Sequence, residues 1–131
     1  MASIMVVDND PCIINMIQRM LEGAGHTVAT ATGGFECLEK LKKTKPELLL
    51  LDVMMPDLSG WDLYWRIRKD DEKIKVAFVS VMEVSPDRKK ELVNEYGISD
   101  YILKPFTQDQ LTEAVDNILK TDQKPIKKPQ E

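Results

Sequence analysis

The stretch LLLLDVMMPDLSG, residues 48–60, places four leucines before a single aspartate and a loop that contains proline and glycine. Four leucines are too few for a typical helix, and Pro46 and Pro56 flank them, so they predict a short buried strand. Strands that are buried on both faces are typical of parallel sheets. Asp52 therefore stands at the carboxyl end of a strand, the position where open α/β sheets bind their ligands.

Three other apolar runs also deliver a polar side chain at or just beyond their ends. Residues 4–7, 76–79 and 101–103 lead to Asp8, Ser80 and Lys104. If the four runs are parallel strands, two carboxylates, a hydroxyl and an amine meet at one edge of one sheet. Strands also end in polar residues simply because loops begin there, but these four types together favour a functional site.

The rest of the chain alternates between strand-like runs and segments of helical period, which indicates repeated βαβ units and a parallel sheet. Strands are expected at residues 3–8, 26–31, 47–51, 75–80 and 100–103. Asp10, Ser85 and Thr107 mark helix starts, because such residues cap helix N-termini. We expect the first helix to place Ala24 on its apolar face, and the short second helix to bury Phe35.

Length and composition indicate one globular domain, residues 1–120, followed by a tail at residues 121–131. The tail holds two prolines, three lysines and one large apolar residue, so we expect it to be flexible. A net charge of −4 argues against direct nucleic-acid binding. No apolar run approaches the roughly 20 residues that cross a bilayer, so no membrane attachment is expected.

The two cysteines, Cys12 and Cys37, lack the spacing of a metal site and are predicted to be reduced thiols in the core. The first ten residues carry no basic leader and turn acidic. Together these features predict a cytoplasmic protein.

The four side chains at the strand ends suit phosphoryl transfer. A carboxylate at position 52 would be held by a rigid strand and still face solvent, as a nucleophile requires. Asp8, one strand away, would repel it unless a cation neutralises both, and oxygen ligands beside a phosphate suggest Mg²⁺. Lys104 could pair with carboxylate or phosphate oxygens, and Ser80 could donate a hydrogen bond. The residues therefore indicate transfer of a phosphoryl group onto Asp52.

At these residues the chain resembles the receiver domain of two-component response regulators. The matching motifs are MVVDND, LLLLDVMMPDLSGWDL, VAFVS and DYILKPF, and the resemblance extends over residues 3–120. It implies an α/β fold with a doubly wound, five-stranded parallel sheet, the flavodoxin-like (βα)₅ arrangement.

The resemblance also implies roles for individual residues. Asp52 would accept a phosphoryl group, Lys104 would contact that group, and Ser80 and Tyr101 would act as the switch residues. The peptide bond between Lys104 and Pro105 would be cis. The Mg²⁺ ligands implied in this way are Asp8, Asn9, Asp52 and the backbone carbonyl of Met54.

Partners follow from the same resemblance. The phosphoryl donor would be a histidine kinase or a phosphotransfer protein, and the output would pass to a downstream effector protein through the fourth helix, fifth strand and fifth helix. The chain would act on its own phosphorylation and dephosphorylation and on no metabolite, as a monomer or a phosphorylation-linked dimer.

Two positions depart from the family pattern. Asn9 stands where the family has a second carboxylate, so we expect weaker Mg²⁺ binding. Val81 stands where a small residue usually follows the switch hydroxyl, so we expect slower phosphorylation and hydrolysis.

Two other functions stay open at this point. The departures at Asn9 and Val81 would suit a pseudo-receiver, a binding module that works without phosphate, whereas Asp52, Ser80 and Lys104 argue against it. A phosphohydrolase with an aspartyl nucleophile would need a second catalytic acid and a cap over its substrate, and the chain is too short for that cap.

Overall fold

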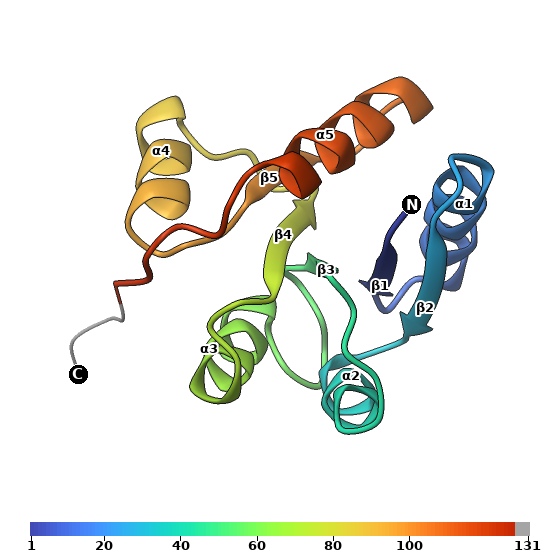
Figure 1. Ribbon diagram of the computed structural model, residues 1–131, viewed down its shortest axis with the longest axis horizontal. Helices are drawn as coiled ribbons and strands as arrows, with labels where there is room; N and C mark the ends of the chain where they lie inside the picture. Colours follow the sequence, from blue (N-terminus) through green and yellow to red (C-terminus); the bar gives the residue numbers. More distant parts are fainter. Residues whose placement is uncertain (128–131) are drawn as a thin grey trace.

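The computed structural model describes residues 1–127, which form one parallel sheet of five strands and five helices (Figure 1). The strands are β1 (Ser3–Val7), β2 (Thr27–Ala31), β3 (Leu48–Asp52), β4 (Lys75–Ser80) and β5 (Asp100–Leu103). The helices are α1 (Pro11–Gly23), α2 (Gly34–Leu41), α3 (Gly60–Asp70), α4 (Pro86–Asn94) and α5 (Gln108–Lys120). The strand order is β2-β1-β3-β4-β5, so the predicted doubly wound (βα)₅ fold is confirmed.

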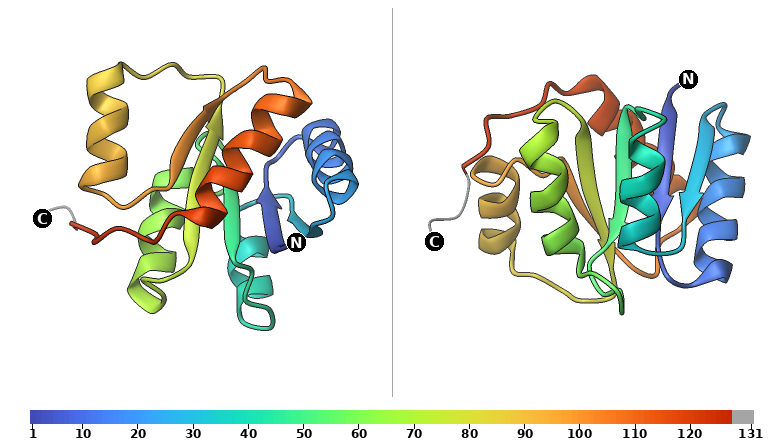
Figure 2. Two further views of the ribbon diagram at one scale, coloured as in Figure 1. Left: turned by 45° about the horizontal axis from the view of Figure 1, so that its top comes forward. Right: turned by 90° about the horizontal axis from the view of Figure 1, so that it is seen from below.

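Helices cover both faces of the sheet, because its strands are apolar on both sides. Alternate strand residues such as Met5 and Leu49 pack in one cluster with buried side chains of α2, α3 and α4. Their neighbours, such as Ile4 and Leu48, pack in a second cluster with α1 and α5. Figure 2 shows these layers, with α2, α3 and α4 on the same side of the sheet. The burial on both faces explains why the central strands are nearly continuous apolar runs.

The predicted helix caps are present at the residues that the sequence indicates. Asp10 accepts a hydrogen bond from the Cys12 N–H at 2.9 Å, and Ser85 accepts one from the Arg88 N–H at 3.1 Å. Thr107 and Gln110 form a reciprocal capping box at the start of α5. Each cap satisfies backbone donors that a helix start leaves unpaired, so these residues define where the helices begin.

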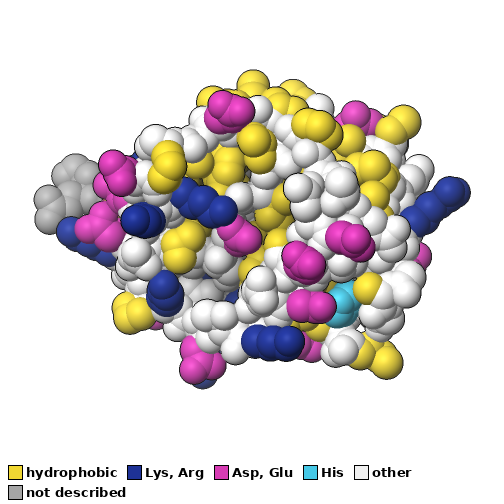
Figure 3. All heavy atoms as spheres, turned by 90° about the horizontal axis from the view of Figure 1, so that it is seen from above, with side chains coloured by type: hydrophobic (Ala, Val, Ile, Leu, Met, Phe, Trp, Pro, Cys, Tyr) yellow, Lys and Arg dark blue, Asp and Glu magenta, His cyan; other side chains and the backbone are white. Residues whose placement is uncertain are grey.

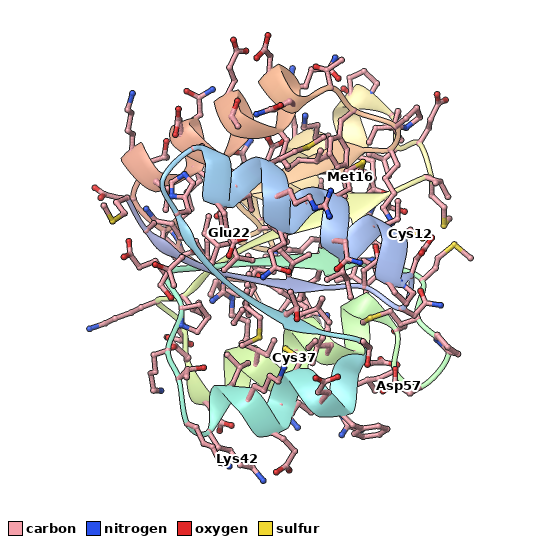
Figure 4. The ribbon with its side chains drawn as sticks, turned by 90° about the vertical axis from the view of Figure 1, so that its right-hand side faces the viewer. Cys12, Met16, Glu22, Cys37, Lys42 and Asp57 are labelled. Carbon is pink, nitrogen blue, oxygen red and sulfur yellow. The ribbon has the colours of Figure 1, made fainter. Side chains whose placement is uncertain are left out.

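Three predictions of burial are wrong. Phe35 is 52% exposed, because the eight-residue α2 turns it toward a groove beside α3 rather than toward the sheet. Ala24 follows the last turn of α1 and is exposed. Cys12 lies in the first turn of α1 and is exposed, whereas Cys37 is buried beneath α2 (Figure 4). Burial raises the pKa of Cys37 to about 12, so its thiol is inert at neutral pH.

An arginine in the interior was not anticipated from the sequence. Arg68 of α3 is fully buried, and its guanidinium lies 4.9 Å from the centre of the Tyr64 ring. It donates to the Tyr64 hydroxyl and to the carbonyls of Ile74 and Gly97. The arginine therefore connects α3 to the start of β4 and to the loop between α4 and β5.

The loop after β3 caps α2 from a distance. Gly33, at the N-cap of α2, has no side chain to accept a hydrogen bond. The Asp57 carboxylate accepts the N–H groups of Gly34 and Phe35 instead, at 3.2 and 3.1 Å. These hydrogen bonds hold the pKa of Asp57 below its usual value. Figure 4 shows Asp57 beside the start of α2.

The C-terminal segment leaves α5 and runs as irregular chain toward α4 (Figure 1). Residues 121–127 make hydrogen bonds near the end of α4. Residues 128–131 of the predicted flexible tail lie outside the described residues, so flexibility of the whole tail stays a prediction. Of the helices within residues 1–127, none has both the length and the apolar character that a bilayer span requires.

Candidate functional site

Strand register brings the four predicted side chains to one edge of the sheet. Parallel pairing sets Val7 beside Leu51, so Asp8 and Asp52 follow in adjacent strands. Ser80 ends β4 opposite Leu103, directly before Lys104. The predicted meeting of these side chains at the carboxyl edge is therefore seen in the structure.

Lys104 lies between the two carboxylates. Its Nζ donates to Oδ2 of Asp8 at 2.7 Å and lies 3.8 Å from Oδ2 of Asp52. The side chains of Asp8, Asp52 and Lys104 are only 3%, 10% and 12% exposed, so water screens these charges weakly. The Lys104 N–H donates to the Ser80 carbonyl at 2.7 Å, and the following bond to Pro105 is cis, as the resemblance implied.

Backbone N–H groups orient both carboxylates. Oδ1 of Asp8 accepts from the Asp10 N–H at 2.9 Å, and Oδ1 of Asp52 accepts from the Met54 N–H at 3.1 Å. In each aspartate the other oxygen is the one that faces Lys104. The two carboxylates are thus fixed in position before any ligand arrives.

The pKa of the Asp52 carboxyl is raised above its usual value. Burial is the main cause, and the negative charge of Asp8 adds to it. The Met54 N–H and the Lys104 ammonium act in the opposite direction but do not cancel the shift. One ammonium between two carboxylates leaves negative charge in excess, so the site favours a further cation.

The oxygen atoms at this edge suit Mg²⁺ better than they suit a metal ion that only protein side chains coordinate. Within residues 1–127 no group of three His, Cys, Asp or Glu side chains is arranged to hold a metal ion. Mg²⁺ commonly binds through one or two carboxylates and completes its shell with water and phosphate oxygens. Asp8 and Asp52 form such a pair of carboxylates, and Mg²⁺ binding by Asp8, Asp52, Asn9 and the Met54 carbonyl stays a prediction.

The predicted switch residues both bind the backbone of Met82. The Ser80 hydroxyl is buried and accepts from the Met82 N–H at 3.1 Å. The Tyr101 hydroxyl donates to the Met82 carbonyl at 2.6 Å, and its ring lies near Phe78 in the core. Sequence reasoning did not anticipate this shared partner, because backbone atoms carry no sequence signal.

The rim of the site is apolar. Met54, Val81 and Met82 are 57%, 65% and 51% exposed. Asn9 is also exposed, and its amide makes no hydrogen bond with any residue that the structure describes. Exposed apolar side chains therefore follow Asp52 and Ser80 closely in the chain, and the exposed amide of Asn9 follows Asp8.

Comparison with known proteins gives a consistent family. The family model for the response regulator receiver domain matches residues 4–116. The regulatory protein PhoP of Bacillus subtilis is 36% identical over 119 residues, which are 89% of this chain and 48% of that protein. The chain spans about half the length of several such curated relatives. Protein PilH of Pseudomonas aeruginosa is 29% identical and is covered over 98% of its length, with 91% of this chain matched.

Solved structures support the same family. The chemotaxis protein CheY4 of Vibrio cholerae superposes with a TM-score of 0.80 at 28% identity, over 90% of this chain and 98% of that one. The response regulator TrrA of Thermotoga maritima, solved in complex with Mg²⁺ and BeF, gives a TM-score of 0.78 at 28% identity, over 90% and 99% of the two chains. The chain described here belongs to the receiver domain family of two-component response regulators.

Proposed function

We propose that this chain is a phosphoacceptor switch in which Asp52 takes up a phosphoryl group from a histidine kinase or a phosphotransfer protein. The observation that supports this most directly is the arrangement of Asp52 and Asp8 around Lys104 at the carboxyl edge of the sheet. Membership of the receiver family supports the same reaction class.

In the proposed transfer a carboxylate oxygen of Asp52 attacks phosphorus while the bond from phosphorus to the donor's leaving atom breaks. Oδ1 of Asp52 is oriented by the Met54 N–H. The Lys104 ammonium, held in place by Asp8, balances charge on the phosphoryl oxygens. Bound Mg²⁺ would supply further neutralisation of the carboxylate and phosphoryl oxygens. Asp8, Asp52 and the Met54 carbonyl would hold it, with Asn9 at the rim.

Signal output is proposed to start at Ser80 and Tyr101. A phosphoryl group on Asp52 would offer new acceptor oxygens to the Ser80 hydroxyl, which now accepts from the Met82 N–H. A shift of the β4–α4 loop would then disturb the bond from Tyr101 to the Met82 carbonyl. The surface of α4, β5 and α5 would change and bind a downstream effector protein.

We propose that the chain acts on no metabolite and works in the cytoplasm. Figure 3 shows acidic and basic side chains interspersed on one face rather than a continuous basic patch. This distribution supports protein partners over nucleic acid.

Intact mass after incubation with acetyl phosphate and Mg²⁺ tests the proposal. We expect a gain of one phosphate that is lost in Asp52→Ala and in a sample with chelator. A gain that persists in Asp52→Ala would place the acceptor elsewhere. No gain in the wild-type chain would contradict the proposal.

A pseudo-receiver is the second candidate, favoured by the amide of Asn9, which has no partner among residues 1–127, and by the exposed Val81. If phosphorylation is the function, Asn9→Asp should bind Mg²⁺ more tightly in a calorimetric titration, because it adds a carboxylate. Val81→Ala should speed both phosphorylation and hydrolysis. A double variant that still takes up no phosphate would favour the pseudo-receiver.

A further inference from the structure

The segment after α5 is fastened to the end of α4 by three hydrogen bonds. Gln123 Nε2 donates to the Gly97 carbonyl at 2.7 Å, and Lys124 Nζ donates to Oδ1 of Asn94 at 2.8 Å. The Lys127 N–H donates to the Glu95 carbonyl at 2.6 Å. The views in Figures 1 and 2 agree that this segment crosses from α5 toward α4.

Ile126 adds an apolar contact to the same place. A Cβ atom at Gly97 would lie 2.5 Å from Cγ1 of Ile126, so the isoleucine packs directly on the glycine backbone. Gly97 also has a φ of 76°, which favours glycine. Gln123 and Ile126 are half-buried, while the lysine side chains of the segment are exposed. Two side chains three positions apart therefore face the protein.

The contacts add partners to a helix end at which the Ile98 N–H already donates to the Leu92 carbonyl. The last carbonyls of a helix lack internal partners, and cations are favoured beside them. The last turn of α4 has no basic residue, and its C-cap is Glu95. The segment supplies both missing parts, an N–H group for the Glu95 carbonyl and the Lys124 ammonium beside Asn94.

Helix α4 places little of its own surface in the core. Of its nine residues, all described, only Leu92 is fully buried. The contacts of residues 121–127 reach the interior as well, because the Gly97 carbonyl also accepts from the buried Arg68 at 3.4 Å. The hydrogen bonding of this segment is also incomplete, since Oε1 of Gln123 is buried without a partner among residues 1–127. A buried unpaired acceptor weakens the docked state and makes it easy to release.

We propose that residues 121–127 form a clasp that holds the end of α4 in the unphosphorylated protein and detaches when Asp52 is phosphorylated. The detachment rests on the proposed function, whereas the clasp itself does not. Phosphorylation of Asp52 would thereby release residues 121–127 and change the surface of α4 at the same time.

Amide hydrogen exchange on the full chain tests the clasp without phosphate. The Lys127 amide is the direct reporter, because its N–H makes the bond to Glu95. In the wild-type chain it should exchange about tenfold or more below the rate of an unstructured amide. Ile126→Ser and Gln123→Ala should each remove this protection and speed exchange in the last turn of α4, with β1 unchanged. Lys127→Ala is the matched control, because it keeps the backbone N–H and should leave protection intact.

An unprotected Lys127 amide in the wild-type chain, or α4 exchange that Ile126→Ser and Gln123→Ala both leave unchanged, overturns the clasp. The second arm repeats the exchange after acetyl phosphate and Mg²⁺, with intact mass recorded on the same sample. Loss of Lys127 protection in the phosphorylated chain supports detachment, and retained protection overturns it. A sample with no mass gain refutes the proposed function, while the first arm still decides the clasp.

Discussion

The face of the sheet under α1 and α5 is filled by aliphatic side chains, whereas the face under α2, α3 and α4 holds aromatic rings and a buried arginine. Every buried member of the cluster under α1 and α5 is Ala, Val, Ile or Leu. The cluster under α2, α3 and α4 includes Tyr64, Phe78 and Tyr101, with Trp61 and Trp65 packed against it. Aliphatic contacts have no direction, but the hydroxyls and the guanidinium of the second face each need a particular acceptor.

The acceptors on the aromatic face belong to loops rather than to strands. Tyr64 donates to the Tyr96 carbonyl, Tyr101 donates to the Met82 carbonyl, and Arg68 donates to the Gly97 carbonyl. These carbonyls lie in the loops before and after α4. The aliphatic face therefore acts as a fixed support, and the aromatic face sets the positions of the segments that the proposed switch moves.

Replacement of the buried arginine should have the largest effect. Arg68→Met keeps the length of the side chain but leaves the Ile74 and Gly97 carbonyls and the Tyr64 hydroxyl without this donor. We expect a loss of about 4 kcal/mol in the free energy of unfolding. Urea denaturation measures it, with the exposed Arg66→Met as control. Equal stability of the two variants would show that the arginine bonds contribute little.

On the aliphatic face, Leu111→Ala should lower the free energy of unfolding by about 3 kcal/mol, because it leaves a cavity between α5 and the sheet. The acetyl phosphate reaction should keep its rate at a temperature where the variant is folded. A changed rate would show that the face under α1 and α5 takes part in the switch as well.

A single hydroxyl on the aromatic face should have a smaller but local effect. Tyr101→Phe keeps the ring and removes the bond to the Met82 carbonyl, so about 1 kcal/mol should be lost. Amide exchange should quicken in residues 81–85 and stay unchanged in α1. Tyr96→Phe is the matched control, because within residues 1–127 the Tyr96 hydroxyl makes no hydrogen bond. Equal effects of the two variants would contradict the role given to Tyr101.

The smallest effect is expected at Asp52, at the carboxyl edge of the sheet. Burial raises the pKa of Asp52, so its ionised form is disfavoured in the folded protein. Asp52→Asn should therefore raise the unfolding temperature at pH 7 by about 2 °C. The gain should vanish as pH falls below about 4, where the wild-type carboxyl is protonated in both states. A lower unfolding temperature at pH 7 would show that the ionised form stabilises the fold.

The parts of the fold that follow from the sequence are those set by local pattern. Strands appeared as apolar runs because the sheet is buried on both faces, and the observed bounds differ from the predicted ones by one residue at β1, β2 and β3. Asp10, Ser85 and Thr107 cap helices within three residues of themselves, so local sequence revealed them. The site was predictable for the same reason, since each of its side chains directly follows or ends a strand.

The parts that did not follow depend on residues far apart in the chain. The burial of Arg68 did not follow from the sequence, because arginine is buried only where several acceptors converge, and here they come from three separate segments. Phe35 was expected in the core by its place in the helical repeat, but the groove beside α3 leaves it exposed. The contacts at the end of α4 could not be predicted for the same reason, because the residues that make them follow α5 in the chain.

Asp57 and Gly33 constrain each other although they lie in different loops. A Cβ atom at position 33 would lie 2.8 Å from Oδ2 and 3.0 Å from Oδ1 of Asp57, so a larger residue there would displace the carboxylate that caps α2. Conversely, without a carboxylate at 57, glycine at 33 loses its advantage and a residue that caps α2 by itself becomes favourable. Across aligned relatives these two positions should therefore covary, with aspartate at 57 accompanied by glycine at 33 and serine or threonine appearing at 33 where 57 is not acidic.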